Sequence, residues 1–258
     1  MTGARVLLSV DGSVATVTIN RPEARNALLR GMGGEIHEKL RSVAADPRVR
    51  ILVLRGAGID FCPGADLKAR SHPGEPVPPP DFAAYQVSVL LQEMPQVTIA
   101  AVRGACAGAG LGYAAACDLR VGDENLRINT AFLDVGVAGD MGVPWTLSRL
   151  IGPGHARDLM FFPRKVRAAE ALAIGLVQRA WPDERFEEEL ASLVGRLAEA
   201  APLALTAMKA NFVDADRLDF RGFVALEAER HIRLLRSEDR SEAFTAWVEK
   251  RPATFQGR

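Results

Sequence analysis

The chain has few cysteines, no excess of one charge and no long apolar segment. The three cysteines, Cys62, Cys106 and Cys117, are odd in number and lack metal-ligand spacing, which is typical of buried free thiols in a reducing compartment. Lysine and arginine together number 32, as do aspartate and glutamate, so the formal charge is zero. This balance argues against a nucleic-acid surface or a polybasic membrane patch, and any bound phosphate must be met locally.

No apolar stretch of the signal-peptide type stands near the N-terminus, and no segment is apolar for long enough to span a membrane. We therefore expect a cytoplasmic protein with neither nucleic acid nor membrane as a partner. With 258 residues, 48% of them hydrophobic, the chain can fill one large core or a core with an appendage.

The stretch from Val97 to Asp118 predicts a strand, a glycine turn and the start of a helix. Residues 97–102 form a β-branched apolar run that is typical of a buried strand, and closely spaced glycines follow it. The N–H groups of Ala109 and Gly110 then have no partner inside the helix, and the helix dipole adds positive potential in front of them. An anionic group is therefore expected at this turn.

Three interpretations of the turn are open. A dinucleotide-binding turn requires glycine at the last position of G-x-G-x-x-G, but Tyr113 stands there and Gly112 comes one residue early. Small residues can also merely let a buried helix pack closely against a sheet. The third interpretation is an oxyanion hole made of backbone amides, which requires a second donor from elsewhere in the chain.

A second stretch supplies such a donor. Residues 50–55 predict another buried strand, a glycine turn follows, and the sequence F-C-P-G-A-D-L-K occupies positions 61–68. Two units of strand, turn and helix can bring the N–H groups of Ala65 and Ala109 to one oxygen atom.

Strands and helices alternate around these two units, which predicts an α/β core. The expected strands are 5–10 and 14–19, joined as a hairpin, and then 119–121 and 126–129. The expected helices are 32–45, 82–94, 143–150, 184–200, 217–236 and 238–250. The proline-rich stretch 71–80 predicts a mobile surface loop.

Five segments, in order along the chain, resemble the signatures of the crotonase, or enoyl-CoA hydratase/isomerase, superfamily. They are Asn20-Arg21-Pro22 with Arg25-Asn26-Ala27-Leu28, Phe61 to Lys68, Val97 to Asp118, Ala131-Phe132 to Leu150, and Glu249-Lys250-Arg251-Pro252 with Phe255. The resemblance implies a stacked ββα core over residues 1–200. It also implies a C-terminal helical region over residues 201–258 that assembles a homotrimer or a dimer of trimers.

The resemblance further implies a reaction on an acyl-CoA, with the amides of Ala65 and Ala109 holding the thioester oxygen. Coenzyme A arrives as part of the substrate, and no other cofactor and no metal is implied. The residues implied to contact it are Arg25, Ala65, Asp66, Leu67 and Lys68, with Trp247 and Lys250 from an adjacent subunit. Asp66 is also expected to have a structural part at the start of a helix.

Two carboxylates of the family's hydratases are absent from this sequence. Those enzymes use two glutamates, one on the helix after the glycine turn and one in the A-F segment. Gly112 and Phe132 occupy these positions here. A conventional hydration with two glutamates is therefore not expected.

Asp140 stands where the family's dienoyl-CoA isomerases, epoxyphenylacetyl-CoA isomerases and 4-chlorobenzoyl-CoA dehalogenases carry an aspartate that works on the acyl chain. A lone carboxylate can carry a proton between carbons or act as a nucleophile. Asp140 could instead cap the helix that begins near Met141 to Val143. Asp134 is a weaker candidate, because a residue in such a turn is expected to face solvent.

The sequence thus favours an enoyl-CoA isomerase, or an unusual hydratase, with Asp140 as the acid and base. One alternative is an acyl-CoA dehalogenase or thioesterase with Asp140 as nucleophile, although Phe132 stands where the dehalogenases carry a tryptophan. Another is a protein that binds acyl-CoA without turning it over.

Overall fold

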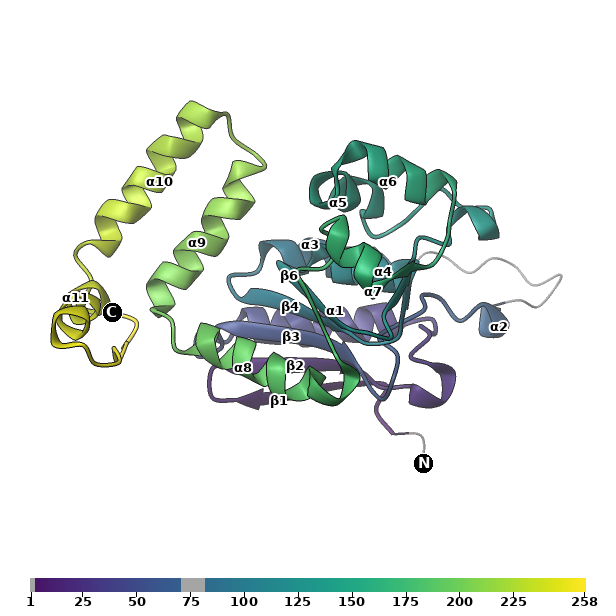
Figure 1. Cartoon of the computed structure of the whole chain (residues 1–258), viewed down its shortest axis with the longest axis horizontal. Coiled ribbons are helices and arrows are strands. Elements are labelled where there is room, and N and C mark those ends of the chain that lie inside the picture. Colours follow the sequence, from purple (N-terminus) through teal and green to yellow (C-terminus); the bar gives the residue numbers. More distant parts are fainter. Residues whose placement is uncertain (1–2, 71–81) are drawn as a thin grey trace.

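A six-stranded sheet forms the centre of the molecule, whose computed structural model describes residues 3–70 and 82–258 (Figure 1). Its strands, in the order in which they lie side by side, are β1 (Val6–Asp11), β2 (Val14–Ile19), β3 (Ile51–Gly56), β4 (Val97–Val102), β6 (Leu119–Asp123) and β9 (Arg179–Trp181). β1 and β2 form the predicted antiparallel hairpin, and the other neighbouring strands are parallel. The α/β core predicted from the sequence is confirmed.

A small second sheet continues the chain directly after β4. It consists of β5 (Ala105–Ala107), β7 (Arg127–Asn129) and β8 (Val166–Arg167), in that order. A single β-bridge between Cys62 and Cys106 ties the segment after β3 to β5. The two predicted glycine turns are therefore held next to each other.

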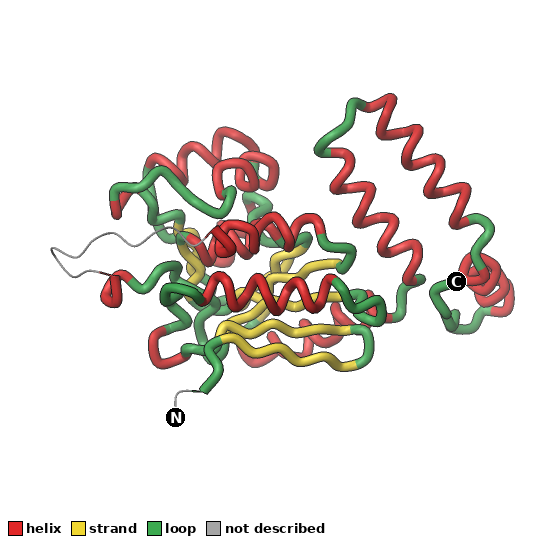
Figure 2. Tube along the Cα trace, turned by 180° about the vertical axis from the view of Figure 1, so that it is seen from behind, coloured by secondary structure: helices red, strands yellow, loops and turns green. Residues whose placement is uncertain are grey.

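Helices cover both faces of the large sheet because the side chains of its central strands are apolar on both sides. In β3, Leu52 and Leu54 belong to the larger core, which also contains the apolar side of α1 (Met32–Ala44). Ile51 and Val53 face the opposite way and pack with α8 (Phe186–Ala198). Figure 2 shows α1 in front of the strands, and Figure 1 shows α8 on the other side.

The other helices of the core surround the glycine turns. They are α2 (Leu67–Arg70), α3 (Phe82–Glu93), α4 (Ala109–Ala116), α5 (Val143–Leu150), α6 (Gly152–Phe161) and α7 (Ala168–Ala173). Short 3-10 helices occupy η1 (Pro22–Ala24), η2 (Leu133–Val135) and η3 (Asp183–Arg185). The predicted loop at 71–80 lies outside the described residues.

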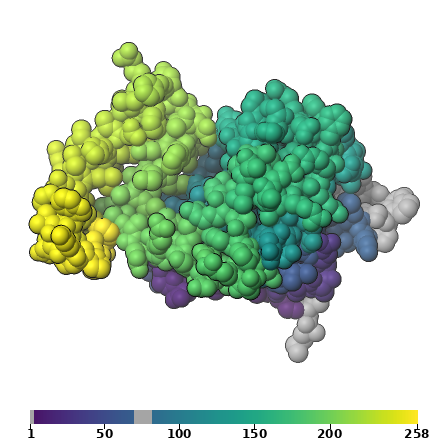
Figure 3. All heavy atoms as spheres, viewed as in Figure 1, coloured from purple at the N-terminus to yellow at the C-terminus, as the bar shows by residue number. Residues whose placement is uncertain are grey.

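Three helices form the C-terminal part and extend to one side of the core (Figures 1 and 3). They are α9 (Pro202–Ala215), α10 (Phe220–Leu234) and α11 (Glu238–Glu249). α9 is not among the helices predicted above. It is attached to the core by the buried Lys209, whose Nζ lies 2.6 Å from Asp118 Oδ1.

Among the described residues, no single helix has both the length and the apolar composition needed to cross a membrane. Only the bent pair Asp183–Ala198 and Pro202–Ala215 meets that criterion, and only when the two are counted together.

Candidate active site

Two backbone segments run side by side from the ends of β3 and β4 toward the predicted oxyanion site. Phe61 N donates to Arg103 O at 2.8 Å, and Cys62 N donates to Ala105 O at 2.9 Å. Ala107 N then donates back to Cys62 O at 2.9 Å. The segments that carry Ala65 and Ala109 are therefore joined by a short ladder of hydrogen bonds.

Ala65 forms a parallel β-bridge with Leu28, and its amide points away from Leu28. Leu28 N donates to Gly64 O at 2.8 Å, and Leu28 O accepts from Asp66 N at 3.0 Å. In such a parallel bridge the residue between the two bonded positions directs its own N–H to the opposite side. The N–H of Ala65 is thus free to face the second segment.

The amide of Ala109 lies at the first position of α4, where an N–H has no intrahelical acceptor. At this end of α4, Gly112 N donates to Gly108 O at 3.1 Å. Neither Ala65 N nor Ala109 N has an acceptor within residues 3–70 and 82–258. Two buried or half-buried donors without an acceptor are the arrangement that an oxyanion hole requires.

Gly64 lets the two amides approach each other. Its φ of +94° is one that side-chain-bearing residues rarely adopt. A Cβ at this position would lie 3.0 Å from Ala107 O and 3.5 Å from Ala109 N. The sequence F-C-P-G-A-D therefore requires glycine immediately before Ala65, both for its backbone angle and for this close contact.

Apolar side chains fill the two positions where the hydratases of the resembling family carry glutamates. A Cβ at Gly112 would overlap Met141 Cβ and would lie 3.3 Å from Val143 Cγ2. Phe132 is 4% exposed, and its Cε1 lies 4.0 Å from the place of a Cβ at Gly108. Met141 and Val143 thus pack beside Gly112 and Phe132 lies near Gly108, so neither position offers a carboxylate.

Asp140 directly precedes Met141, the residue that packs against α4, and its Oδ1 is buried. Its main-chain oxygen accepts from Val143 N at 3.0 Å. The N-cap of α5 is Gly142, so the capping position itself is not Asp140. Asp134 is exposed in η2, as expected.

The residues near Ala65 that are expected to contact coenzyme A lie on α2 or directly before it. Lys68 and Leu67 are exposed on α2. Asp66 Oδ1 accepts from Ala69 N at 3.1 Å, and this hydrogen bond, with that from Arg21, lowers the pKa of Asp66. Asp66 thus has the structural part expected of it at the start of α2.

Arg25 forms an ion pair that no pattern in the sequence predicts. Its Nε lies 2.8 Å from Asp60 Oδ2, although the two residues are far apart in the chain. The side chain of Arg25 remains 58% exposed, whereas that of Asp60 is buried. The sequence gives little signal for this pair, because single charges before a turn are common and usually face solvent.

Trp247 and Lys250 lie at the opposite end of the molecule from α2 (Figure 1). Trp247 is 78% exposed at the end of α11. These two residues cannot reach the amide of Ala65 within one chain. The expected contact of both residues with the same coenzyme A would therefore involve a second copy of the chain.

The three cysteines are free and buried, as predicted. Burial raises the pKa of both Cys62 and Cys117 to about 12. Cys62 lies close to the two amides, but its thiol stays protonated at neutral pH and is a poor nucleophile.

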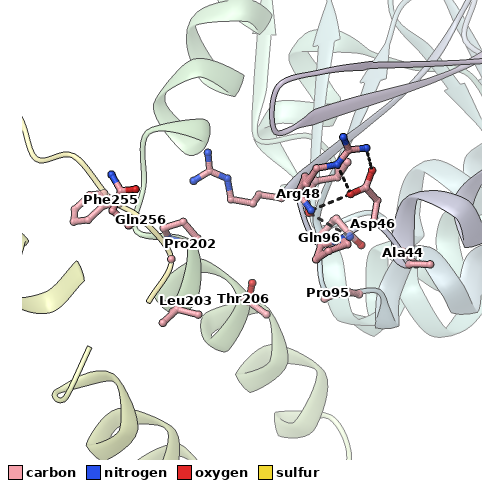
Figure 4. A pocket seen from close by; sticks show the side chains of 15 residues that line it. Ala44, Asp46, Arg48, Pro95, Gln96, Pro202, Leu203, Thr206, Phe255 and Gln256 are labelled. Atoms are coloured by element: carbon pink, nitrogen blue, oxygen red, sulfur yellow. Dashed lines mark hydrogen bonds and ion pairs between the residues drawn. The ribbon is translucent and has the colours of Figure 1, made fainter. Parts of the chain in front are cut away.

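A cavity of about 590 Å³ lies elsewhere, between the core and the C-terminal helices (Figure 4). Arg48, Gln96, Thr206 and Phe255 are among the residues that line it. It adjoins the beginnings of β3 and β4, whereas Ala65 and Ala109 follow the ends of these strands. We therefore do not assign it to the same site.

Comparison with known proteins places this geometry in a family. Residues 9–258 match the family model described as Enoyl-CoA hydratase/isomerase. The chain belongs to the enoyl-CoA hydratase/isomerase family. The resemblance inferred from the five sequence segments is therefore confirmed.

Several relatives within the family are named hydratases. The crotonyl-CoA hydratase of Syntrophomonas wolfei is 30% identical over 253 residues, covering 97% of each chain. The short-chain-enoyl-CoA hydratase of Clostridium acetobutylicum is 31% identical over 249 residues, covering 95% of each. The crystal structure of an enoyl-CoA hydratase from Bacillus anthracis superposes with a TM-score of 0.91 at 26% identity, covering 99% of this chain and 100% of that one.

Proposed function

We propose that this family member moves the double bond of an enoyl-CoA. In this proposal the amides of Ala65 and Ala109 hold the thioester oxygen, and Asp140 carries the proton. The observation that supports it best is that Met141 packs against Gly112 on α4 and the buried Phe132 lies near Gly108, while Asp140 adjoins Met141. One carboxylate beside two amide donors is sufficient for isomerisation.

The chemistry follows from where charge develops. When a base removes the α-proton of a thioester, negative charge moves to the carbonyl oxygen as an enolate forms. Two N–H groups directed at that oxygen stabilise the charge, each by about 3–4 kcal/mol in comparable oxyanion holes. Asp140 takes up the proton from the α-carbon and returns it at the γ-carbon, so the reaction needs no external oxidant, reductant or water.

Hydration requires more than this arrangement supplies. A water molecule must lose a proton as it attacks the β-carbon, and the α-carbon must receive one. The apolar residues at positions 112 and 132 provide neither an acid nor a base for these steps. The relatives are named hydratases, which favours hydration. Only a measurement on this protein can therefore decide between the two reactions.

Coenzyme A would run along the exposed side chains of Arg25 and Lys68, with the acyl group directed toward Phe132. Basic side chains suit the phosphate groups of coenzyme A. Trp247 and Lys250 would complete this site from another subunit of a trimer or of a dimer of trimers.

The test compares two reactions on one protein. Rates are measured for hydration of crotonyl-CoA and for conversion of a 3-enoyl-CoA into the 2-enoyl isomer. We expect isomerisation with little or no hydration. Hydration at the usual enzymic rate of about 10 to 1,000 per second would contradict the proposal.

Variants of two nearby aspartates assign the proton carrier. Asp140→Asn should lower the isomerisation rate by about 10² to 10⁴-fold and leave binding of coenzyme A unchanged. Asp134→Asn is the matched control, because Asp134 is exposed on the same connection. Equal activity of both variants would remove Asp140 from the mechanism, and binding of acyl-CoA without any turnover would favour a binding protein.

A further inference from the structure

Asp60 is a buried carboxylate that accepts four hydrogen bonds from three residues. Its side chain is 2% exposed. Arg25 donates to both oxygens, from Nε to Oδ2 at 2.8 Å and from Nη2 to Oδ1 at 3.2 Å. Oδ1 also accepts from Ala105 N at 2.7 Å and from Arg127 Nη2 at 3.4 Å. The carboxylate thus joins the residue that follows η1 to residues from β5 and β7.

These contacts stand at the start of both segments that lead to the amides. Asp60 precedes the segment that ends in Ala65, and Ala105 precedes the segment that ends in Ala109. The hydrogen bond from Ala105 N to Asp60 Oδ1 therefore adds a side-chain link at the start of the backbone ladder described above. Between Asp60 and the amides, the ladder continues through Cys62.

The backbone of Asp60 is fixed as firmly as its side chain. Asn26, fully buried, donates from Nδ2 to Asp60 O at 2.6 Å and to Ala57 O at 2.8 Å. A Cβ at Gly104 would lie 2.5 Å from Asp60 Oδ1. Neither the turn after β3 nor the turn after β4 can shift without breaking contacts to Asp60.

The electrostatics keep this carboxylate ionised. Burial alone would raise the pKa of Asp60, but hydrogen bonds from Arg25 and Ala105 and the charge of both arginines lower it below its usual value. A buried ion pair is costly to assemble and weak evidence of a stabilising purpose. A rigid, directional link between segments is what its geometry provides.

We infer that Asp60 is a positioning residue of the oxyanion hole, setting the separation of the Ala65 and Ala109 amides through Ala105 and the two arginines. This inference rests on the function proposed above. A donor misplaced by about 1 Å can cost on the order of 100-fold in rate, so small shifts in this link are enough to matter.

The experiment measures the hydrogen bonds at the thioester directly. Butyryl-CoA labelled with ¹³C at its carbonyl is bound to the protein, and the carbonyl stretch is recorded by infrared difference spectroscopy. Donation by two amides lowers this frequency relative to free butyryl-CoA. In Asp60→Asn we expect the frequency to return toward the free value and kcat for isomerisation to fall roughly 10- to 100-fold.

Asp46→Asn is the matched control. Asp46 also pairs with an arginine through two side-chain hydrogen bonds, which Arg48 donates from Nε at 3.0 Å and from Nη2 at 2.7 Å, but it lies before the start of β3. In Asp46→Asn, the carbonyl frequency of bound butyryl-CoA and kcat should equal those of the unaltered protein. Arg127→Met is a milder variant that removes the longest of the Asp60 contacts, and we expect an intermediate frequency from it.

Each outcome decides a different claim. If the unaltered protein binds butyryl-CoA without a shift in the carbonyl frequency, the proposed oxyanion hole is wrong and this inference falls with it. A shift that is equal in the unaltered protein and in Asp60→Asn would overturn the inference alone. If Asp60→Asn does not fold, Arg127→Met decides, and an unchanged frequency and kcat in that variant would overturn the inference.

Discussion

At the scale of single residues, the absence of a side chain at Gly112 has a structural cause in this chain. The sequence shows that a carboxylate is missing there, but it does not show what occupies the space. In the structure Met141 packs against the backbone of Gly112. Placing glutamate back at this position would therefore not restore a hydratase, because Met141 stands where its side chain begins.

Gly112→Ala should destabilise the protein for the same reason. The added methyl group meets Met141 Cβ inside a packed core, and such overpacking costs about 1–3 kcal/mol. Urea unfolding at equilibrium measures this loss. Gly154→Ala is the control, since nothing lies within 4 Å of its Cβ position on α6, and it should be neutral or slightly stabilising. Equal stability of both variants would show that Met141 moves aside at little cost in free energy.

Asp60 marks the limit of what the sequence discloses about the site. The positions of Ala65 and Ala109, each after a strand and a glycine turn, could be predicted, whereas their role as an oxyanion hole stays a prediction. The link between Asp60 and Arg25 could not, since nothing in the pattern pairs two charges 35 residues apart. Whether Asp140 acts in catalysis is a prediction that only activity can test.

At the scale of helices and strands, the sequence predicts the elements with a strong apolar pattern. The bounds of β2, β4 and α5 agree with those expected, and β3 begins one residue later than predicted. α10 begins at Phe220 rather than Arg217, because Asp219 caps it by accepting from Gly222 N. β5 and β8 are too short for a pattern to reveal them.

α9 has no such pattern, because its apolar residues are spread around the helix, and it is held to the core by a buried charge. Lys209 Nζ donates to both oxygens of Asp118 and to Leu91 O. Lys209 is almost fully buried, while Asp118 is partly exposed. This contact fixes the direction in which the C-terminal helices leave the core.

Lys209→Met should therefore cost about 3 kcal/mol of stability, the lower end for breaking a buried pair, because water can still reach Asp118. Thermal unfolding followed by circular dichroism would record a lower midpoint. Lys165→Met provides the comparison, since Lys165 is exposed on the connection after α6. A midpoint unchanged in Lys209→Met would mean that packing alone holds α9.

At the scale of the whole molecule, the C-terminal helices leave large apolar side chains uncovered. Phe220 is 83% exposed, and Phe212, Phe244 and Trp247 are each more than half exposed. Exposed apolar surface on this scale is typical of an interface. The separation of α11 from α2 leads to the same expectation, because the coenzyme A site would be shared between chains (Figure 1).

We expect the purified protein to be a trimer or a dimer of trimers. Light scattering during size-exclusion chromatography should give three or six times the chain mass of 27.8 kDa. Replacing Phe220 and Trp247 with glutamate together should reduce that mass while leaving the folded core intact. A stable monomer of the unaltered chain would contradict this expectation and the shared coenzyme A site.

Proton exchange at the carbon next to the thioester tests the central claim most directly. The protein is incubated in deuterium oxide with saturated and unsaturated acyl-CoA thioesters, and deuterium at the α- and γ-carbons is followed by mass spectrometry. We predict exchange with the unaltered protein and with Asp134→Asn, and its loss in Asp140→Asn. Absence of exchange on every thioester that demonstrably binds would contradict an enolate held by Ala65 and Ala109.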